Sequence, residues 1–307
     1  MSKEQFMQNQ FSFWIEKILK ELNGYEELKK EKLNEKGKEL LVKKTSELES
    51  ELLKSLNKNT VDKKEYGDII FFNYFSYAFI NKIIKLKKGE EDGIIDNLFI
   101  SQIQKFSYVF WLLVNEQYEA SIILFRSLYE GLVITLFLLK NSCCIEKFSL
   151  ASFYKIFNIF DKTSLQFIHD ELKNNPNPRF NDLYSKEGFD KYSHEELLSG
   201  YGWARDGIKS KKSTEAKIDF RDILEEVFQD ENFKIMYRMA SSFVHSNMAV
   251  SANNIIQNII KNMILSYIRS FCMPVFNDIF LGYYLTENIE CYVYKTILEN
   301  VKNKFTS

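Results

Sequence analysis

A scarcity of helix-breaking residues is the feature that most constrains the fold of this chain. Its 307 residues include only 3 prolines and 11 glycines, so few positions readily end a helix. Sheet-rich folds need many tight turns, which such a composition supplies poorly. The aromatic share of 15%, with 27 Phe and 17 Tyr, indicates bulky side chains packed between helices. The sequence therefore predicts an all-α protein, a multi-helix bundle with room for one large domain or two small ones.

Composition divides the chain into three regions. Residues 1–60 are rich in Lys and Glu, with apolar residues at helical spacing, and predict an N-terminal amphipathic helical arm. This arm is either a solvated hairpin packed on the main body or a segment that binds a partner protein. Residues 61–307 predict the helical bundle domain. Within it, residues from about 173 to 219 hold two of the three prolines and four glycines, which predicts an irregular insertion.

The apolar pattern also predicts where the helices of the bundle lie. They are expected at 62–88, 96–115, 117–140, 147–158, 161–174, 219–229, 231–249, 253–281 and 286–303.

Charge, leader and cysteine content favour a cytoplasmic protein that is not attached to a membrane. The formal net charge of -1 gives no global attraction to nucleic acid or anionic lipid, so any contact with RNA requires a local basic patch. The polar N-terminus lacks the apolar core of a signal peptide. The most apolar run, Ile122–Leu139, contains Arg126 and Glu130 and is interpreted as a buried core helix. The four cysteines show no metal-binding spacing and are interpreted as reduced thiols.

The one concentrated chemical signal is the segment Tyr237–Asn247 around His245. Arg238 and His245 are seven residues apart, so a helix places them on one face, about 10 Å apart along its axis. Ser241 and Ser242 lie between them, on or beside that face. Arginine binds phosphate bidentately, and histidine is the side chain best suited to proton transfer near neutral pH. A buried histidine bonded to a neighbouring helix is the structural alternative.

A second cluster occurs on the most apolar helix. Arg126 and Glu130 are four residues apart, and isolated buried charges are costly. They are therefore expected to pair with each other, as a structural ion pair, or with a polar group of another helix such as the row around His245. The other two histidines, His169 and His194, have no comparable neighbours.

Both segments resemble a bacterial family, the domain of unknown function 5677. The resemblance rests on RSLYEG at Arg126–Gly131 and on YR-x-x-SS-x-VH-S at Tyr237–Ser246, with Gly200–Trp203 fitting the preceding loop. It covers about residues 65–280. The family is similar in outline to the HEPN superfamily, small helical bundles that often act as metal-independent ribonucleases in toxin and anti-phage systems. HEPN enzymes carry an Arg, four to six residues, and then a His, which Arg238 and His245 match with six between them.

The resemblance implies an RNA-cleaving enzyme that works as a homodimer without metal or cofactor. His245 would perform acid–base catalysis, Arg238 would stabilise developing charge, Glu130 or Ser242 would orient His245, and Arg126 would support the anion site. The predicted catalytic residues are thus Arg238, His245, Glu130 and Ser242, and the predicted binding residues are Arg126, Tyr237, Ser241 and Asn247. Met239 departs from the polar residue that follows the Arg in many active HEPN enzymes, and some HEPN domains are inactive.

Two alternatives therefore stay open. One is a non-catalytic helical module, in which His245 and Glu130 form a buried polar bond and the N-terminal arm binds a partner. The other is a module that senses a small anion or nucleotide at the same residues.

Overall fold

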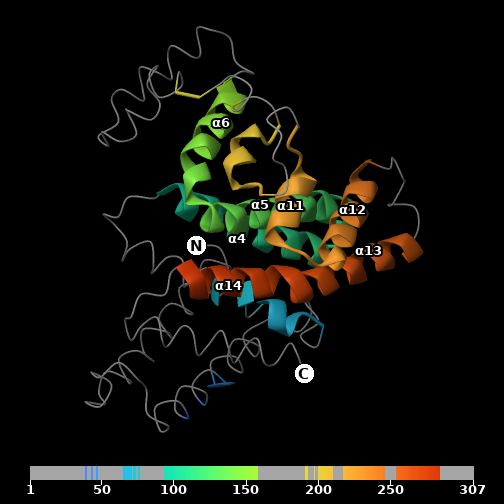
Figure 1. The fold of residues 1–307 in the computed structure, drawn as a ribbon. Coiled ribbons are helices and arrows are strands. Elements are labelled where there is room, and N and C mark those ends of the chain that lie inside the picture. The colour runs from blue at the N-terminus through green and yellow to red at the C-terminus, as the bar shows by residue number, and fades with distance from the viewer. Residues whose placement is uncertain are drawn as a thin grey trace. The chain divides into compact units, whose positions relative to one another are not determined.

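The structure, a computed structural model, is mostly helical in the part of the chain that it describes (Figure 1). The described residues are 39, 43, 46–47, 65–70, 72–73, 75–76, 93–157, 191–192, 197, 200–209, 217–245 and 254–283. They contain no strand, so the predicted all-α fold, a multi-helix bundle, is confirmed. The N-terminal arm, its boundary at residue 60 and most of the predicted insertion lie outside these residues.

The described residues divide into two compact units. The first comprises those up to residue 91, those at 99–132 and those from 239 onward. The second comprises 93–98 and those at 133–238.

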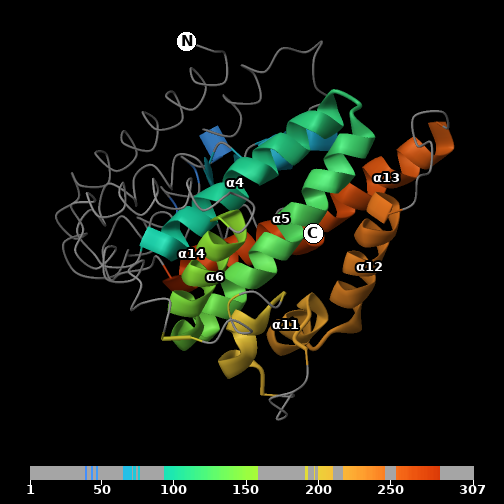
Figure 2. The same cartoon turned by 90° about the horizontal axis from the view of Figure 1, so that it is seen from above.

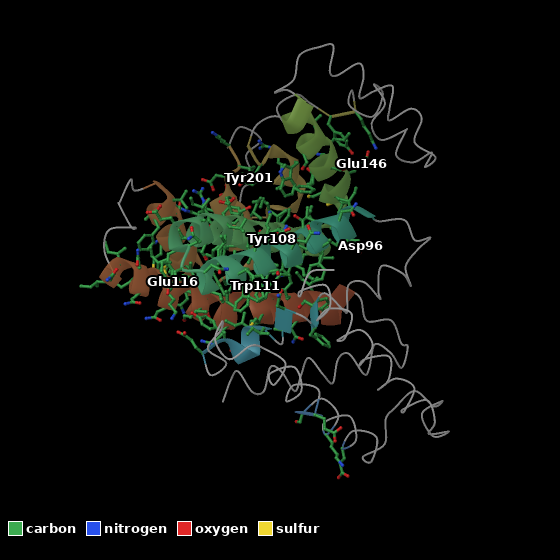
Figure 3. The ribbon with its side chains drawn as sticks, turned by 180° about the vertical axis from the view of Figure 1, so that it is seen from behind. Asp96, Tyr108, Trp111, Glu116, Glu146 and Tyr201 are labelled. Carbon is green, nitrogen blue, oxygen red and sulfur yellow. The ribbon has the colours of Figure 1, made fainter. Side chains whose placement is uncertain are left out.

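A helical hairpin supplies residues 99–132 of the first unit, and its two ends, 93–98 and 133–140, belong to the second. Helix α4 (Gly93–Val114) and helix α5 (Tyr118–Lys140) run side by side in opposite directions (Figure 2). At the turn, the Gln117 N–H bonds to the Leu112 carbonyl at 2.8 Å and the Glu116 N–H to the Leu113 carbonyl at 3.1 Å. These two bonds satisfy carbonyl groups that the end of α4 leaves without helical partners. The pattern requires a left-handed residue, and Glu116 occupies that position with φ 59° (Figure 3).

A long helical segment packs on this hairpin in the first unit. Helix α13 (Asn254–Tyr267) passes through a π-helical turn (Ile268–Cys272) into α14 (Met273–Tyr283) without a break (Figure 1). Pro274 explains the π turn, because its ring collides with the preceding turn of a regular α-helix. The Met273 N–H bonds to the carbonyl of Ile268, five residues back. The prediction of one helix over 253–281 is therefore confirmed in extent but missed the wider turn.

Aromatic side chains fill the core of the first unit. The ring centroids of Tyr129 and Phe271 lie 4.4 Å apart, and those of Phe99 and Phe280 lie 5.0 Å apart. Such pairs add to the stabilisation from burial alone. Arg269 adds a bidentate ion pair with Asp68, which fastens the π turn to the helical residues 65–70. The high Phe and Tyr content thus serves packing between helices, as the composition predicted.

The second unit is built around Trp203. The centroid of its indole ring lies 4.8 Å from that of Phe148 on α6 (Ile145–Phe157) and 5.8 Å from that of Phe137 on α5. Trp203 lies in the 3-10 helix η3 (Gly202–Gly207), which packs against the 3-10 turn η2 (Ser142–Cys144). The segment Gly200–Trp203, part of the family resemblance, is therefore a core element of this unit.

Helices α11 (Phe220–Val227) and α12 (Glu231–His245) complete the second unit, with α12 continuing into the first. Asp219 begins α11 with a capping box, its carboxylate accepting from the backbone N–H groups of Arg221 and Asp222.

Helix α5 has the length and composition of a membrane span, and 56% of its most apolar window is buried inside the protein. The core helix of a soluble protein can have the same length and composition. The absence of a membrane span therefore stays a prediction.

Candidate functional site

Helix α12 carries most of the predicted site. It begins after Asp230, whose carboxylate accepts from the backbone N–H of Asn232 at 2.9 Å. Its last described residue is His245, so the predicted end at residue 249 lies outside the described part. Arg238 and His245 both belong to this one continuous helix, as their spacing predicted.

Arg238 is the most accessible charged group of the predicted site. Its side chain is 54% exposed, and its Nη2 donates to Oε1 of Glu231 at 3.1 Å. Glu231 is equally open, at 55%. Ion pairs this exposed contribute about 0–1 kcal/mol, because water screens the charges and both side chains lose freedom. The guanidinium can therefore exchange Glu231 for a phosphate at little cost.

The other polar residues of α12 differ in exposure. Ser242, one turn after Arg238, is exposed, whereas Ser241 is half-buried. Tyr237 is also half-buried, with its ring 4.6 Å from that of Phe220. Arg238 and Ser242 thus form the accessible pair, while Tyr237 supports the packing of α12 in the second unit.

Several predicted residues cannot be placed as side chains. His245 lies on α12, but its side chain is outside the described part, as is Asn247. The predicted roles of these two residues stay predictions. His169 and His194, for which no role was predicted, also lie outside the described part.

Arg126 and Glu130 form the second cluster, on α5. The Arg126 Nε donates to Glu130 Oε1 at 3.0 Å, and the side chains are 23% and 25% exposed. The prediction that they pair with each other is confirmed. Lys105, on α4, lies close enough to interact with Glu130. Burial lowers the pKa of Lys105, and the Glu130 charge acts in the opposite direction.

Two residues of these clusters were missed by sequence reasoning. Glu231 is one, although it stands seven residues before Arg238 and so on the same face of a helix. Lys105 is the other, and no local sequence signal places it near Glu130, because only the α4–α5 hairpin joins them.

The predicted site combines arginine and serine side chains of α12 with His245, whose side chain lies outside the described part. Among the described residues, no group of three or more His, Cys, Asp and Glu side chains is arranged to hold a metal ion. The chemistry on offer is anion binding by arginine and proton transfer by histidine.

Comparison with known proteins identifies a family. No curated protein and no solved structure matches the chain significantly. The model of a family of unknown function (DUF5677) matches residues 92–258, which is more than half of the chain and includes the Arg126–Gly131 and Tyr237–Ser246 segments. The match is narrower than the 65–280 expected from the resemblance, and it runs from the start of α4 into α13. The chain therefore belongs to this family of unknown function, DUF5677.

Proposed function

We propose that this protein is a HEPN-like, metal-independent endoribonuclease whose reaction centre is the Arg238–His245 face of α12. The main support is the exposure of Arg238 and Ser242 on α12. The same helix carries His245, seven residues after the arginine. An exposed guanidinium whose ion pair with Glu231 is itself open to solvent is well suited to capture a phosphodiester.

The proposed reaction needs only groups of the protein and of RNA. The 2′-hydroxyl attacks the adjacent phosphorus, and the bond to the 5′-oxygen of the next nucleotide breaks. His245 assists the proton transfers, and Arg238, released from Glu231, stabilises the charge that develops on the phosphate oxygens. The products carry a cyclic phosphate and a free 5′-hydroxyl.

The remaining predicted residues have supporting roles in this proposal. Ser242 or Glu130 orients His245, and Arg126 adds positive charge to the anion site. Ser241, Tyr237 and Asn247 contribute binding contacts. The enzyme acts in the cytoplasm as a homodimer, in a toxin or anti-phage system.

The test is cleavage of RNA in the presence of EDTA. Purified wild type, His245→Ala and the control Arg221→Ala, an exposed arginine of α11 outside the site, are incubated with total RNA and tRNA. We expect wild type and the control to cleave, His245→Ala to be inactive, and the new ends to be cyclic phosphates. Toxicity of the expressed wild type, relieved by His245→Ala, is the expected cellular counterpart. Absence of cleavage by a well-folded wild type across these RNAs would overturn the proposal.

A second candidate, a non-catalytic interaction or anion-sensing module, is favoured by apolar exposure. Ile235 and Met239 on α12, and Ile255 and Ile259 on α13, are large apolar side chains open to solvent. Ile235 and Met239 are one turn apart on α12, and Ile255 and Ile259 are one turn apart on α13. Exposed apolar side chains that neighbour each other on a helix often mark a protein interface. A protein that does not cleave RNA, and whose partner binding is lost in Met239→Glu but retained in His245→Ala, would favour this candidate.

A further inference from the structure

Two adjacent cysteines lie at the junction of α5 and α6, in the second unit. Cys143 and Cys144 both belong to the 3-10 turn η2, and their Sγ atoms are 3.9 Å apart. Both are free thiols. Cys143 is exposed to solvent, whereas Cys144 is fully buried. One thiol is therefore accessible to small molecules, and the other is held directly behind it.

The surroundings of Cys144 hold its sulfur in place. Its backbone N–H bonds to the Asn141 carbonyl at 2.9 Å, and its sulfur receives a hydrogen bond from the Gly207 backbone at the end of η3. Burial, together with Cys143 and the charge of Asp206, raises the pKa of the Cys144 thiol to about 12. At neutral pH Cys144 is consequently a protonated thiol and a poor first target for an oxidant.

We propose that Cys143 is a modification site for hydroperoxides and that Cys144 is its resolving thiol, so that the pair forms a reversible vicinal disulfide. The geometry matches the usual arrangement of a redox-sensing cysteine, which is solvent-accessible and stands next to a second cysteine. This inference is independent of the proposed ribonuclease activity.

The chemistry proceeds in two balanced steps. The Cys143 sulfur attacks one peroxide oxygen, the O–O bond breaks, and Cys143 is oxidised to sulfenic acid while the hydroperoxide is reduced to water or an alcohol. The Cys144 sulfur then attacks the Cys143 sulfur, the S–O bond breaks, and water leaves with the Cys144 thiol proton. The raised pKa of Cys144 slows this second step, because little thiolate is present. The short, fixed distance between the two sulfurs compensates by raising the rate of their reaction.

The disulfide is expected to be readily reduced again. Consecutive Cα atoms are about 3.8 Å apart across a trans peptide, below the range of roughly 4.4–6.8 Å that disulfides prefer. A bridge between neighbours is therefore strained, and thiols reduce strained bridges easily. Such a bond suits a reversible modification better than a permanent crosslink.

Bridging should also disturb the packing of η2 on η3. To form the bridge, the two sulfurs must approach from 3.9 Å to about 2.0 Å, and any part of this movement made by the Cys144 sulfur strains its contact with Gly207. The space around Gly207 is tight, since a Cβ there would collide with Phe137 and approach Asn141 Cγ to 2.9 Å. We therefore expect faster amide exchange in residues 200–209 of the oxidised protein.

The test is peptide mapping after brief exposure of the full chain to hydrogen peroxide. We expect the wild-type peptide with both cysteines to lose two hydrogens, and dithiothreitol to restore them. Cys144→Ser should instead accumulate a dimedone-reactive sulfenic acid at Cys143, and Cys143→Ser should leave Cys144 unmodified. The peptide of Cys272, another buried thiol whose pKa burial raises, provides an internal control that should stay reduced.

Two results would overturn the proposal. One is the formation of sulfinic acid on Cys143 at the same rate in wild type and in Cys144→Ser. Equal rates would show that Cys144 does not react with the Cys143 sulfenic acid. The other is oxidised wild type that contains only bridges between molecules. Cys143→Ser changes an exposed side chain and should fold normally, so failure of Cys144→Ser to fold still leaves a decisive comparison between wild type and Cys143→Ser.

Discussion

Two arginine–glutamate ion pairs have nearly the same N···O distance but differ in burial. The comparison shows that exposure, more than distance, decides whether an arginine can bind a ligand. The Arg126–Glu130 pair on α5 measures 3.0 Å and is about three-quarters buried. The Arg238–Glu231 pair on α12 measures 3.1 Å and is more than half exposed. Distance alone would rank them as equals. Breaking the first leaves a charge partly out of water, whereas breaking the second costs little, so only the second arginine is readily available to a ligand.

The largest expected effect concerns the rate of RNA cleavage. Arg238→Ala should lower the rate by about 100-fold, because the proposed reaction then loses the group that stabilises the developing phosphate charge. Arg126→Ala should lower it less, since Arg126 is already engaged by Glu130. Rates are measured on one tRNA substrate in EDTA, below the melting temperature of every variant. A greater loss in Arg126→Ala would reverse the comparison.

The second prediction concerns stability. Arg126→Ala should lower the free energy of unfolding by about 1–3 kcal/mol, because the partly buried Glu130 loses its ion pair with Arg126. Arg238→Ala should change it by less than about 0.5 kcal/mol, as expected of an exposed pair.

Urea unfolding followed by circular dichroism measures both changes. The double variant Arg126→Met/Glu130→Leu is the control, and should recover part of the lost stability because neither charge of this pair remains, although Lys105 loses its interaction with Glu130. Equal losses in the two single alanine variants would contradict the distinction between the pairs.

The third prediction extends the comparison to the packing next to Glu130. A Cβ at Gly131 would collide with the side-chain amide of the buried Gln102. Gly131→Ala should therefore cost about 1–3 kcal/mol, since a packed interior cannot take the extra methyl group without strain. Gly93→Ala, at the exposed start of α4, would meet only Asn97 Nδ2 at 3.8 Å and should be neutral or slightly stabilising. Thermal unfolding of both variants measures the difference, and a neutral Gly131→Ala would show that Gln102 moves freely.

The fourth prediction concerns the ion pair between Glu231 and Arg238, which is expected to compete with RNA binding. Glu231→Gln weakens the ion pairs of Glu231 with Arg238 and with Lys234, and it removes a negative charge beside the proposed phosphate site. RNA should bind a few-fold more tightly, in line with about 0–1 kcal/mol for such a pair, while the melting temperature stays unchanged. Fluorescence anisotropy with a labelled RNA measures this in the His245→Ala background, which prevents cleavage. Weaker binding of the Gln variant would mean that Glu231 positions Arg238 instead of competing for it.

The smallest expected effect is at the exposed tip of the hairpin. Glu116 adopts a left-handed conformation that glycine accepts without steric cost. Glu116→Gly should raise stability by about 0.5–1 kcal/mol if relief of this strain exceeds the entropy gained by the unfolded chain. Gln117→Gly is the control and should destabilise, because it adds the entropy cost without relieving strain. A loss of stability in Glu116→Gly would show that the entropy term is larger.

Sequence reasoning located the helices well. The helices expected at 117–140 and 147–158 are observed as Tyr118–Lys140 and Ile145–Phe157. It missed the π turn, although Pro274 within the predicted helix was a usable signal. Glu231 was not predicted because the Arg–Ser–His signal begins at Arg238, whereas the ion-pair partner of Arg238 lies two turns before it.

What the sequence determined by itself was local. Few helix breakers and a regular apolar period suffice to predict helices, because helical hydrogen bonds join residues four apart. The same locality predicts the Arg126–Glu130 pair, one turn apart on one helix.

Only the tertiary structure decided burial. Cys143 and Cys144 are identical neighbours, yet one is exposed and the other is sealed against η3, some sixty residues further along the chain. Likewise, Gly131 depends on Gln102, and the contrast between the two arginines depends on what covers each helix face. The physical reason is that exposure, and with it the energy of a charge or the reactivity of a thiol, depends on which distant segments pack nearby.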